Sequence, residues 1–189
     1  MITCLNRARQ SGGLAVDRFA PPSMPSPYPN NNHARDGFAD NHTTFGKILR
    51  GELPANILHE DEQTLCFRDI SPASDLHVLI IPKKLIQHFG CCEAGDVPLL
   101  RHMEAVALKV LQAEYPSLDI EAARADGTAS LGYHKWPLIT VYHLHLHLIY
   151  PQPISWTRPF HKMIFPQSYG MFYESSTSVI KGCEAKRSD

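Results

Sequence analysis

The chain has 189 residues, of which 43% are hydrophobic and 20% are charged. This length and composition are typical of one globular domain with tails. The formal net charge of −1 argues against a broad surface for nucleic acid. No apolar run approaches the roughly 18 residues of a membrane-spanning helix, so we expect no membrane partner.

Residues 1–43 are predicted to be a disordered extension. Its segment APPSMPSPYPNNN is rich in Pro, Ser and Asn and has no pattern that buries a core. Arg7 and Arg9 precede the first acidic residue, Asp17, so a mitochondrial targeting segment is the alternative interpretation. Otherwise we expect a cytoplasmic or nuclear protein.

The folded domain is predicted over residues 44–182, with a tail over 183–189. Its longest element is a helix in which apolar residues recur at i, i+3 and i+4, with Asp96 as N-cap and Pro98 in the first turn. The first half of the domain is predicted to contain a short helix, three strands and this long helix, at residues 45–54, 56–62, 64–70, 77–84 and 95–115.

The second half of the domain is predicted to contain two strands, over residues 119–125 and 140–150. A short strand over 170–174 is followed by a helix over 175–182, with a serine cap and Gly182 at its end. The predicted fold class is therefore α+β, with about five strands in a mainly antiparallel sheet, one long helix and one or two short helices.

The stretch TVYHLHLHLIYP, residues 140–151, places histidines at every second position, with leucines between them. Side chains at i, i+2 and i+4 share one face of a strand. His143, His145 and His147 are thus predicted to share one face, and the leucines are predicted to face a hydrophobic core. A strand that gives one face to imidazoles suggests either chemistry or a metal.

A metal site is one interpretation of the triad, because His-x-His is a zinc-ligand spacing. However, His143 and His147 are about 13 Å apart along a strand, so all three histidines cannot easily bind one ion. No cysteine or carboxylate motif marks a further ligand. We therefore expect no metal and no other cofactor. Structural histidines on a wet face are a further alternative.

Nucleophilic attack on phosphorus fits the triad better. A neutral imidazole can form a covalent phosphoramidate when one ring nitrogen is free and the other is held as an N–H donor, typically by a backbone carbonyl. The middle histidine has two more imidazoles beside it, which can position phosphate oxygens and protonate a leaving group. No GxxxxGK[ST] loop offers another way of binding phosphate.

The motif HLHLHLI and the block DISP…HVLIIPK resemble the histidine triad (HIT) superfamily of nucleotide hydrolases and transferases. The resemblance covers roughly residues 44–182. It is greatest to the third Hint branch, the adenosine monophosphoramidase group. This resemblance implies a HIT-like fold, a purine nucleotide substrate and a homodimer.

The resemblance also implies catalytic roles for particular residues. His145 corresponds to the nucleophile, His147 to a phosphate contact, and the backbone around His143 to the group that orients His145. His77 matches a fourth active-site histidine. Thr140 occupies the position of a serine that hydrogen-bonds near the leaving group, and it keeps the hydroxyl.

The nucleotide-binding residues implied by the resemblance lie in and after a predicted strand. Asp69 matches the carboxylate that accepts hydrogen bonds from the two ribose hydroxyls. The alternative interpretation is that Asp69 is only a turn residue before Pro72. Phe67, Arg68 and Ile70 would line the base pocket.

Two departures from the family pattern bear on function. Many relatives carry a Cys-x-x-Cys that helps to bind zinc, but this chain has Thr43-Thr44-Phe45-Gly46 there. Ile139 replaces the usual Gln before the Ser/Thr. We expect hydrolysis of adenosine 5′-monophosphoramidates through a covalent nucleotidyl-histidine. The alternatives are a dinucleoside polyphosphate hydrolase, an aprataxin-like enzyme that removes adenylate, and a non-catalytic nucleotide sensor or scaffold.

Overall fold

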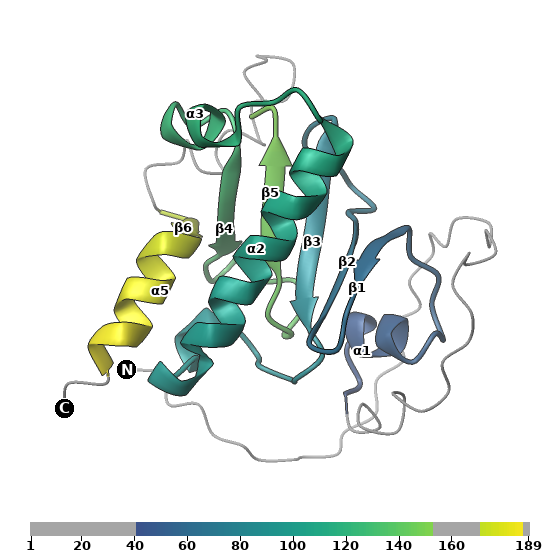
Figure 1. Ribbon diagram of the computed structural model, residues 1–189. Coiled ribbons are helices and arrows are strands. Elements are labelled where there is room, and N and C mark those ends of the chain that lie inside the picture. The colour runs from purple at the N-terminus through teal and green to yellow at the C-terminus, as the bar shows by residue number, and fades with distance from the viewer. Residues whose placement is uncertain (1–40, 153–170, 187–189) are drawn as a thin grey trace.

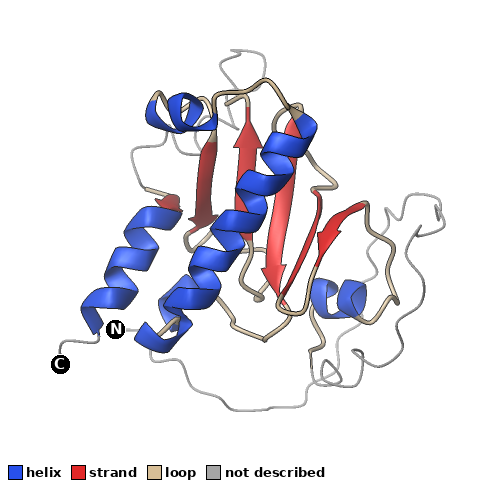
Figure 2. Ribbon diagram, viewed as in Figure 1, coloured by secondary structure: helices blue, strands red, loops and turns tan. Residues whose placement is uncertain are grey.

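The computed structural model describes residues 41–152 and 171–186. These residues confirm the predicted α+β class, with a sheet of six antiparallel strands in the order β1-β2-β3-β5-β4-β6 (Figures 1 and 2). The strands are β1 (Ile57–Glu60), β2 (Thr64–Arg68), β3 (Leu76–Pro82), β4 (Ser130–His134), β5 (Leu146–Tyr150) and β6 (Tyr173–Ser175).

The longest helix, α2, lies diagonally across one face of the sheet, and α5 packs against α2 near the β4–β6 edge (Figure 1). The helices are α1 (Thr44–Leu49), α2 (Val97–Glu114), α3 (Ile120–Ala125) and α5 (Ser176–Ala185). No helix within the described residues is long and apolar enough to cross a membrane.

The sheet has two differently used faces. The α2 side holds the main core, in which Leu144, Leu146 and Leu148 are all buried. The prediction that the leucines of the triad segment face the core is thus confirmed. On the opposite face, Phe45 of α1 packs against Phe67 and a few aliphatic side chains of β2 and β3. The second face is therefore only partly covered by apolar residues.

The predicted strand over 119–125 is wrong, because these residues form α3. The Asp119 side chain caps the helix by accepting a hydrogen bond from the Ala122 N–H at 3.0 Å. The sheet instead contains β4, which the sequence pattern did not indicate. A Cβ on Gly132 of β4 would lie 2.3 Å from the Tyr173 ring, so glycine permits the close approach of β6.

The histidine segment is only partly a strand, since β5 begins at Leu146 rather than at residue 140. Just before it, the Leu144 N–H donates to the Ile86 carbonyl at 2.6 Å. The histidine triad is thus divided between this irregular segment and β5. The last helix has the predicted cap at Ser175, but it does not end at Gly182 and continues to Ala185.

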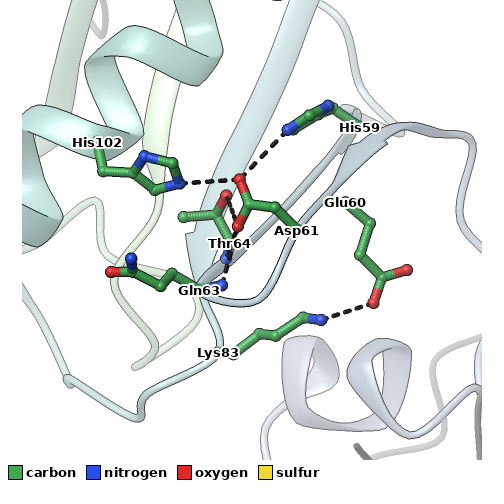
Figure 3. Close-up of polar contacts among 7 residues, drawn as sticks. All are labelled: His59, Glu60, Asp61, Gln63, Thr64, Lys83 and His102. Atoms are coloured by element: carbon green, nitrogen blue, oxygen red, sulfur yellow. Dashed lines mark hydrogen bonds and ion pairs between the residues drawn. The ribbon is translucent and has the colours of Figure 1, made fainter.

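The turn between β1 and β2 is tied to α2 through one carboxylate (Figure 3). Asp61 Oδ1 accepts hydrogen bonds from the N–H groups of Gln63 and Thr64, at 2.9 and 2.8 Å. Asp61 Oδ2 lies 3.2 Å from His59 Nε2 and 2.8 Å from Nε2 of His102, which belongs to α2. This carboxylate therefore joins the sheet edge to the helix layer.

Candidate active site

Four imidazoles gather on the sheet face opposite α2, with His147 of β5 at their centre. The centroid of the His147 ring lies 5.2 Å from that of His77 on β3, 4.3 Å from that of His134 on β4, and 4.9 Å from that of His145. Gly132 of β4 pairs with His147, so His134, two residues later, lies on the same face. Three adjacent strands thus build the cluster.

His145 has the geometry required of a nucleophile. Its Nδ1–H donates to the carbonyl oxygen of His143 at 2.7 Å. Because a carbonyl only accepts, the proton of the neutral ring lies on Nδ1 and the lone pair on Nε2. Burial lowers the pKa of His145, although the bond to the His143 carbonyl and the charge of Asp69 act in the opposite direction. The ring also packs edge-on against Phe45, with centroids 5.2 Å apart.

The tautomer of His147 is fixed by a short chain of hydrogen bonds. The Ala73 N–H donates to Nδ1 of His77 at 3.2 Å, which places the proton of neutral His77 on Nε2. That Nε2–H then donates to Nδ1 of His147 at 2.8 Å. Neutral His147 consequently carries its proton on Nε2. Burial lowers its pKa well below the ordinary value, with contributions from the neighbouring imidazoles.

His143 has a different environment, since both of its ring nitrogens are bonded within the protein. Its Nε2–H donates to the Pro82 carbonyl at 2.8 Å, and its Nδ1 accepts a hydrogen bond from the Asn41 amide at 2.8 Å. The residue is fully buried, and burial lowers its pKa to about 4. His143 therefore contributes its carbonyl, rather than its ring, to the arrangement around His145.

His134 is the residue of this cluster that the sequence analysis did not identify. Burial, followed by the charges of His145 and His77, lowers its pKa to about 4. No motif or spacing in the sequence connects it to the triad. It enters the site only because β4, which was not predicted, pairs with β5.

Asp69 lies at the β3 side of the cluster. Its backbone N–H donates to the carbonyl of His77 at 2.9 Å, and its Oδ1 accepts the Ser71 N–H at 2.7 Å. Its other oxygen, Oδ2, lies 3.5 Å from Nε2 of His77. Phe67 lies nearby in the apolar cluster with Phe45, with ring centroids 5.6 Å apart. A carboxylate beside an apolar wall suits a nucleoside, which has both hydroxyls and a flat base.

Three further predicted residues have other surroundings. Arg68 forms an ion pair with Glu114 of α2. Ile70 is 73% exposed. Thr140 is exposed, and its neighbour Ile139 lines the small hollow beside His145.

Two sets of potential metal ligands exist within the described residues. Their ligand atoms all lie within 4.8 Å of one another, in the sets His134–His145–His147 and Asp69–His77–His147. From the sequence, His143, His145 and His147 are too spread along the chain to bind one ion together. In the structure, His134 replaces His143 and joins His145 and His147 as a third imidazole within ligand distance. The expectation of a metal-free protein stays a prediction.

Comparison with known proteins places this geometry in a family. The family model described as the scavenger mRNA decapping enzyme C-terminal binding domain matches residues 42–158. An uncharacterized HIT-like protein of Synechocystis is 37% identical over 114 residues, which are 60% of this chain and 94% of that protein.

Solved structures give the same result. A HIT family hydrolase from Legionella pneumophila has a TM-score of 0.51 and 35% identity, over 60% of this chain and 96% of that one. A HIT family hydrolase from Clostridium thermocellum has a TM-score of 0.51 and 32% identity, over 61% and 95% of the two chains. The chain belongs to the histidine triad superfamily.

Proposed function

We propose that the protein hydrolyses adenosine 5′-monophosphoramidates through a covalent intermediate on His145. The observation that carries this proposal is the 2.7 Å hydrogen bond from His145 Nδ1–H to the His143 carbonyl. It leaves Nε2 as the nitrogen with the lone pair, and burial keeps the ring neutral. The HIT family hydrolases of known structure support hydrolysis as the reaction class.

The reaction has two steps. The His145 Nε2 lone pair attacks the α-phosphorus, a phosphorus–nitrogen bond to the imidazole forms, and the bond to the leaving amine breaks. The amine nitrogen takes a proton from an acid in the site. Water then attacks the same phosphorus, the bond to His145 breaks, AMP leaves, and the proton lost by water restores the acid.

His134 and His147 serve the phosphate and the leaving group. The Nε2–H of His147 donates to a phosphate oxygen, because its tautomer is set through His77. His134 supplies the proton for the amine. Both rings are neutral before substrate binds, but the negative phosphate favours their protonated forms once it lies beside them.

Asp69 and the apolar wall bind the nucleoside. The carboxylate accepts the two ribose hydroxyls, while Phe67 and Phe45 contribute to the wall against which the base packs. The ribose does not change during cleavage of the phosphorus–nitrogen bond, so these contacts add binding energy equally to the substrate and the transition state.

Trapping the intermediate tests this mechanism. Rapid mixing with a fluorogenic adenosine phosphoramidate should release the amine in a burst, if hydrolysis of the intermediate is slower than its formation. An alkaline quench followed by mass spectrometry should map a nucleotidyl adduct to His145, because phosphohistidine is labile to acid. His145→Asn should lower kcat/KM by about a thousandfold. His42→Ala, at an exposed histidine, is the matched control.

An adduct on His143 or His147 would overturn the role assignment, and full activity of His145→Asn would overturn the mechanism. Cleavage of a phosphoanhydride is the second candidate function, favoured by the match to the decapping-enzyme family model. A turnover screen of adenosine phosphoramidate against diadenosine polyphosphates decides between the two. Tight binding of AMP without turnover of either substrate would indicate a sensor or scaffold instead.

A further inference from the structure

The C-terminal strand β6 brings a buried aromatic ring to the histidine cluster. This strand pairs with β4 at one end of the sheet (Figure 1). Tyr173 of β6 lies directly opposite His134 of β4. Residues that lie directly opposite each other in an antiparallel pair point to the same face of the sheet. The Tyr173 side chain therefore lies on the face that carries the imidazoles.

The Tyr173 ring contacts two members of the cluster. Its centroid lies 5.9 Å from that of His134, with the two ring planes at 75°, and 6.5 Å from that of His147. The centroids of His134 and His147 are themselves 4.3 Å apart. Aromatic rings favour edge-on and offset arrangements at separations of about 4.5–7 Å. Three rings from the adjacent strands β6, β4 and β5 thus pack together.

Tyr173 is itself fixed from several directions. A Cβ on Gly132 would lie 2.3 Å from Cε1 and 2.6 Å from Cζ of the Tyr173 ring, so the ring packs closely on the backbone of β4. Tyr173 is buried and forms a small apolar cluster with Ile149 and Ala73. Its hydroxyl lies 3.4 Å from Ser130 Oγ. A ring packed in this way has little room to move and restricts the rings that it contacts.

The orientation of the His134 ring matters because this residue is assigned the proton for the leaving amine. As the bond between phosphorus and the amine breaks and the bond to His145 forms, a proton passes from the protonated His134 ring to the amine nitrogen. A general acid must lie within hydrogen-bond reach of that nitrogen, roughly 2.6–3.2 Å. A misplacement of about 1 Å can cost roughly a hundredfold in rate.

We propose that Tyr173 is a positioning residue, which holds the His134 ring in the orientation that protonates the leaving amine. This inference rests on the proposed function, and it makes β6 a part of the active site. Tyr173 acts through its ring, because the ring contacts His134 whereas the hydroxyl lies beside Ser130. Its loss should therefore slow those substrates whose amine needs a proton in order to leave.

The test varies the leaving amine on a constant AMP moiety. Butylamine is basic and leaves poorly without a proton, whereas 4-nitroaniline spreads its electron pair over the ring and leaves with less help. Tyr173→Met should lower kcat/KM about tenfold for the butylamine substrate and less than about twofold for the 4-nitroaniline substrate. Tyr173→Phe keeps the ring and should restore most of the butylamine rate.

Tyr115→Met is the matched control. It removes an edge-on ring contact with Tyr150, with centroids 4.7 Å apart, that belongs to the core on the α2 side. This variant should leave the ratio of the two kcat/KM values at the parental value.

A second background determines whether Tyr173 acts through His134. His134→Gln removes the acid and should lower kcat/KM for the butylamine substrate about a hundredfold. Tyr173→Met added to His134→Gln should cause no further change in the ratio of the two kcat/KM values, because no acid remains to be oriented.

Each other outcome overturns the inference. Equal slowing of both substrates by Tyr173→Met, or additive effects in the double variant, would refute the positioning role while His145 remains the nucleophile. A selective loss in Tyr173→Phe would assign the effect to the hydroxyl and refute the role of the ring, even if circular dichroism shows that Tyr173→Met does not fold. Full activity of His134→Gln would remove the acid that Tyr173 is proposed to orient. Failure of the parent protein to release either amine would instead refute the proposed function, and the inference with it.

Discussion

His143 and His145 are the same residue type two positions apart, yet the backbone gives them opposite chemistry. The His145 ring donates one proton to a carbonyl and keeps a lone pair at the other nitrogen. The His143 ring is bonded at both nitrogens, to Pro82 and Asn41. The sequence pattern marks the triad, but it cannot distinguish these two environments, because the bonding partners come from distant parts of the chain.

Asp69→Asn should raise KM about tenfold and change kcat much less, because the proposed ribose contact contributes uniform binding. Steady-state kinetics with an adenosine phosphoramidate measures both parameters. Asp75→Asn, an exposed carboxylate in the same connection between β2 and β3, is the matched control. Equal KM values in Asp69→Asn and the parent would remove Asp69 from the nucleotide site.

The pH dependence of kcat/KM should reflect the buried nucleophile. An ordinary histidine titrates near pH 6.5 and loses its lone pair below that value. Burial lowers the pKa of His145, so the neutral, reactive ring persists to lower pH and the acid limb of kcat/KM should lie below 6.5. The charge of Asp69 raises this pKa. Asp69→Asn should therefore move the limb further towards acid, and a limb at or above 6.5 in the parent would contradict this account.

At the scale of elements, local pattern predicted some parts of the fold well. The apolar spacing of α2 and the leucine face of the triad segment are properties of contiguous residues, and both were predicted correctly. The strand β4 was missed because Gly132 and its neighbours show no alternation, and its place depends on pairing with β5 and β6. His134 was missed together with its strand. Site residues that arise from strand pairing thus leave no local signal.

The clamp between the β1–β2 turn and α2 should contribute to stability rather than to activity. Burial alone would raise the pKa of Asp61, but hydrogen bonds from Gln63, Thr64 and His102 hold that pKa well below its usual range. Asp61→Asn removes the charge that these donors stabilise. We expect it to lower the free energy of unfolding by about 2 kcal/mol, measured by urea denaturation.

Glu60→Gln is the control for this clamp, because Glu60 pairs with Lys83 and not with Asp61 or His102 (Figure 3), and its side chain is 41% exposed. The free energy of unfolding should change by less than about 0.5 kcal/mol in this variant. Activity should be retained in Asp61→Asn, since His102, its partner in the clamp, belongs to α2 on the face opposite the histidine cluster. An Asp61→Asn protein as stable as the parent would rule out the clamp.

For the whole molecule, buried neutral histidines make the fold sensitive to mild acid. The pKa of His143 is about 4 in the folded protein, against about 6.5 for an unperturbed histidine. Below pH 6.5 the unfolded chain therefore binds a proton that the folded protein does not bind. The contribution of neutral His143 to the free energy of unfolding is therefore complete above pH 6.5. It is lost as the pH falls towards 4, and the loss from this residue alone is about 3 kcal/mol.

Urea denaturation at pH 7 and pH 5 measures this loss. His143→Gln should be less stable than the parent at pH 7, because it alters a bonded and buried ring, but its stability should depend less steeply on pH. The slope, rather than the absolute stability, is the quantity that tests the buried histidine. A parent protein equally stable at pH 7 and pH 5 would be incompatible with neutral burial of this group.

Asn41 is a buried residue that lies outside the predicted domain of residues 44–182. Its amide nitrogen donates to His143, its side-chain oxygen accepts the Thr43 hydroxyl at 2.7 Å, and its carbonyl accepts Arg50 Nη1 at 2.7 Å. A Cβ on Gly46 would lie 2.1 Å from that carbonyl oxygen, so α1 packs closely on this residue. Asn41 thus connects α1 to the segment that presents His145.

Deletion of residues 1–40 should leave kcat/KM within about twofold of the parent and thermal stability unchanged, because the composition of that segment offers no core.

Asn41→Ala in the shortened chain should instead lower the free energy of unfolding by about 1–3 kcal/mol, since the buried Nδ1 of His143 loses its donor. The same variant should lower kcat/KM, because the His143 carbonyl that holds His145 becomes less fixed. His42→Ala in the shortened chain is the control, since this neighbouring side chain is exposed. Loss of fold or activity on deleting residues 1–40 alone would show that the extension belongs to the domain.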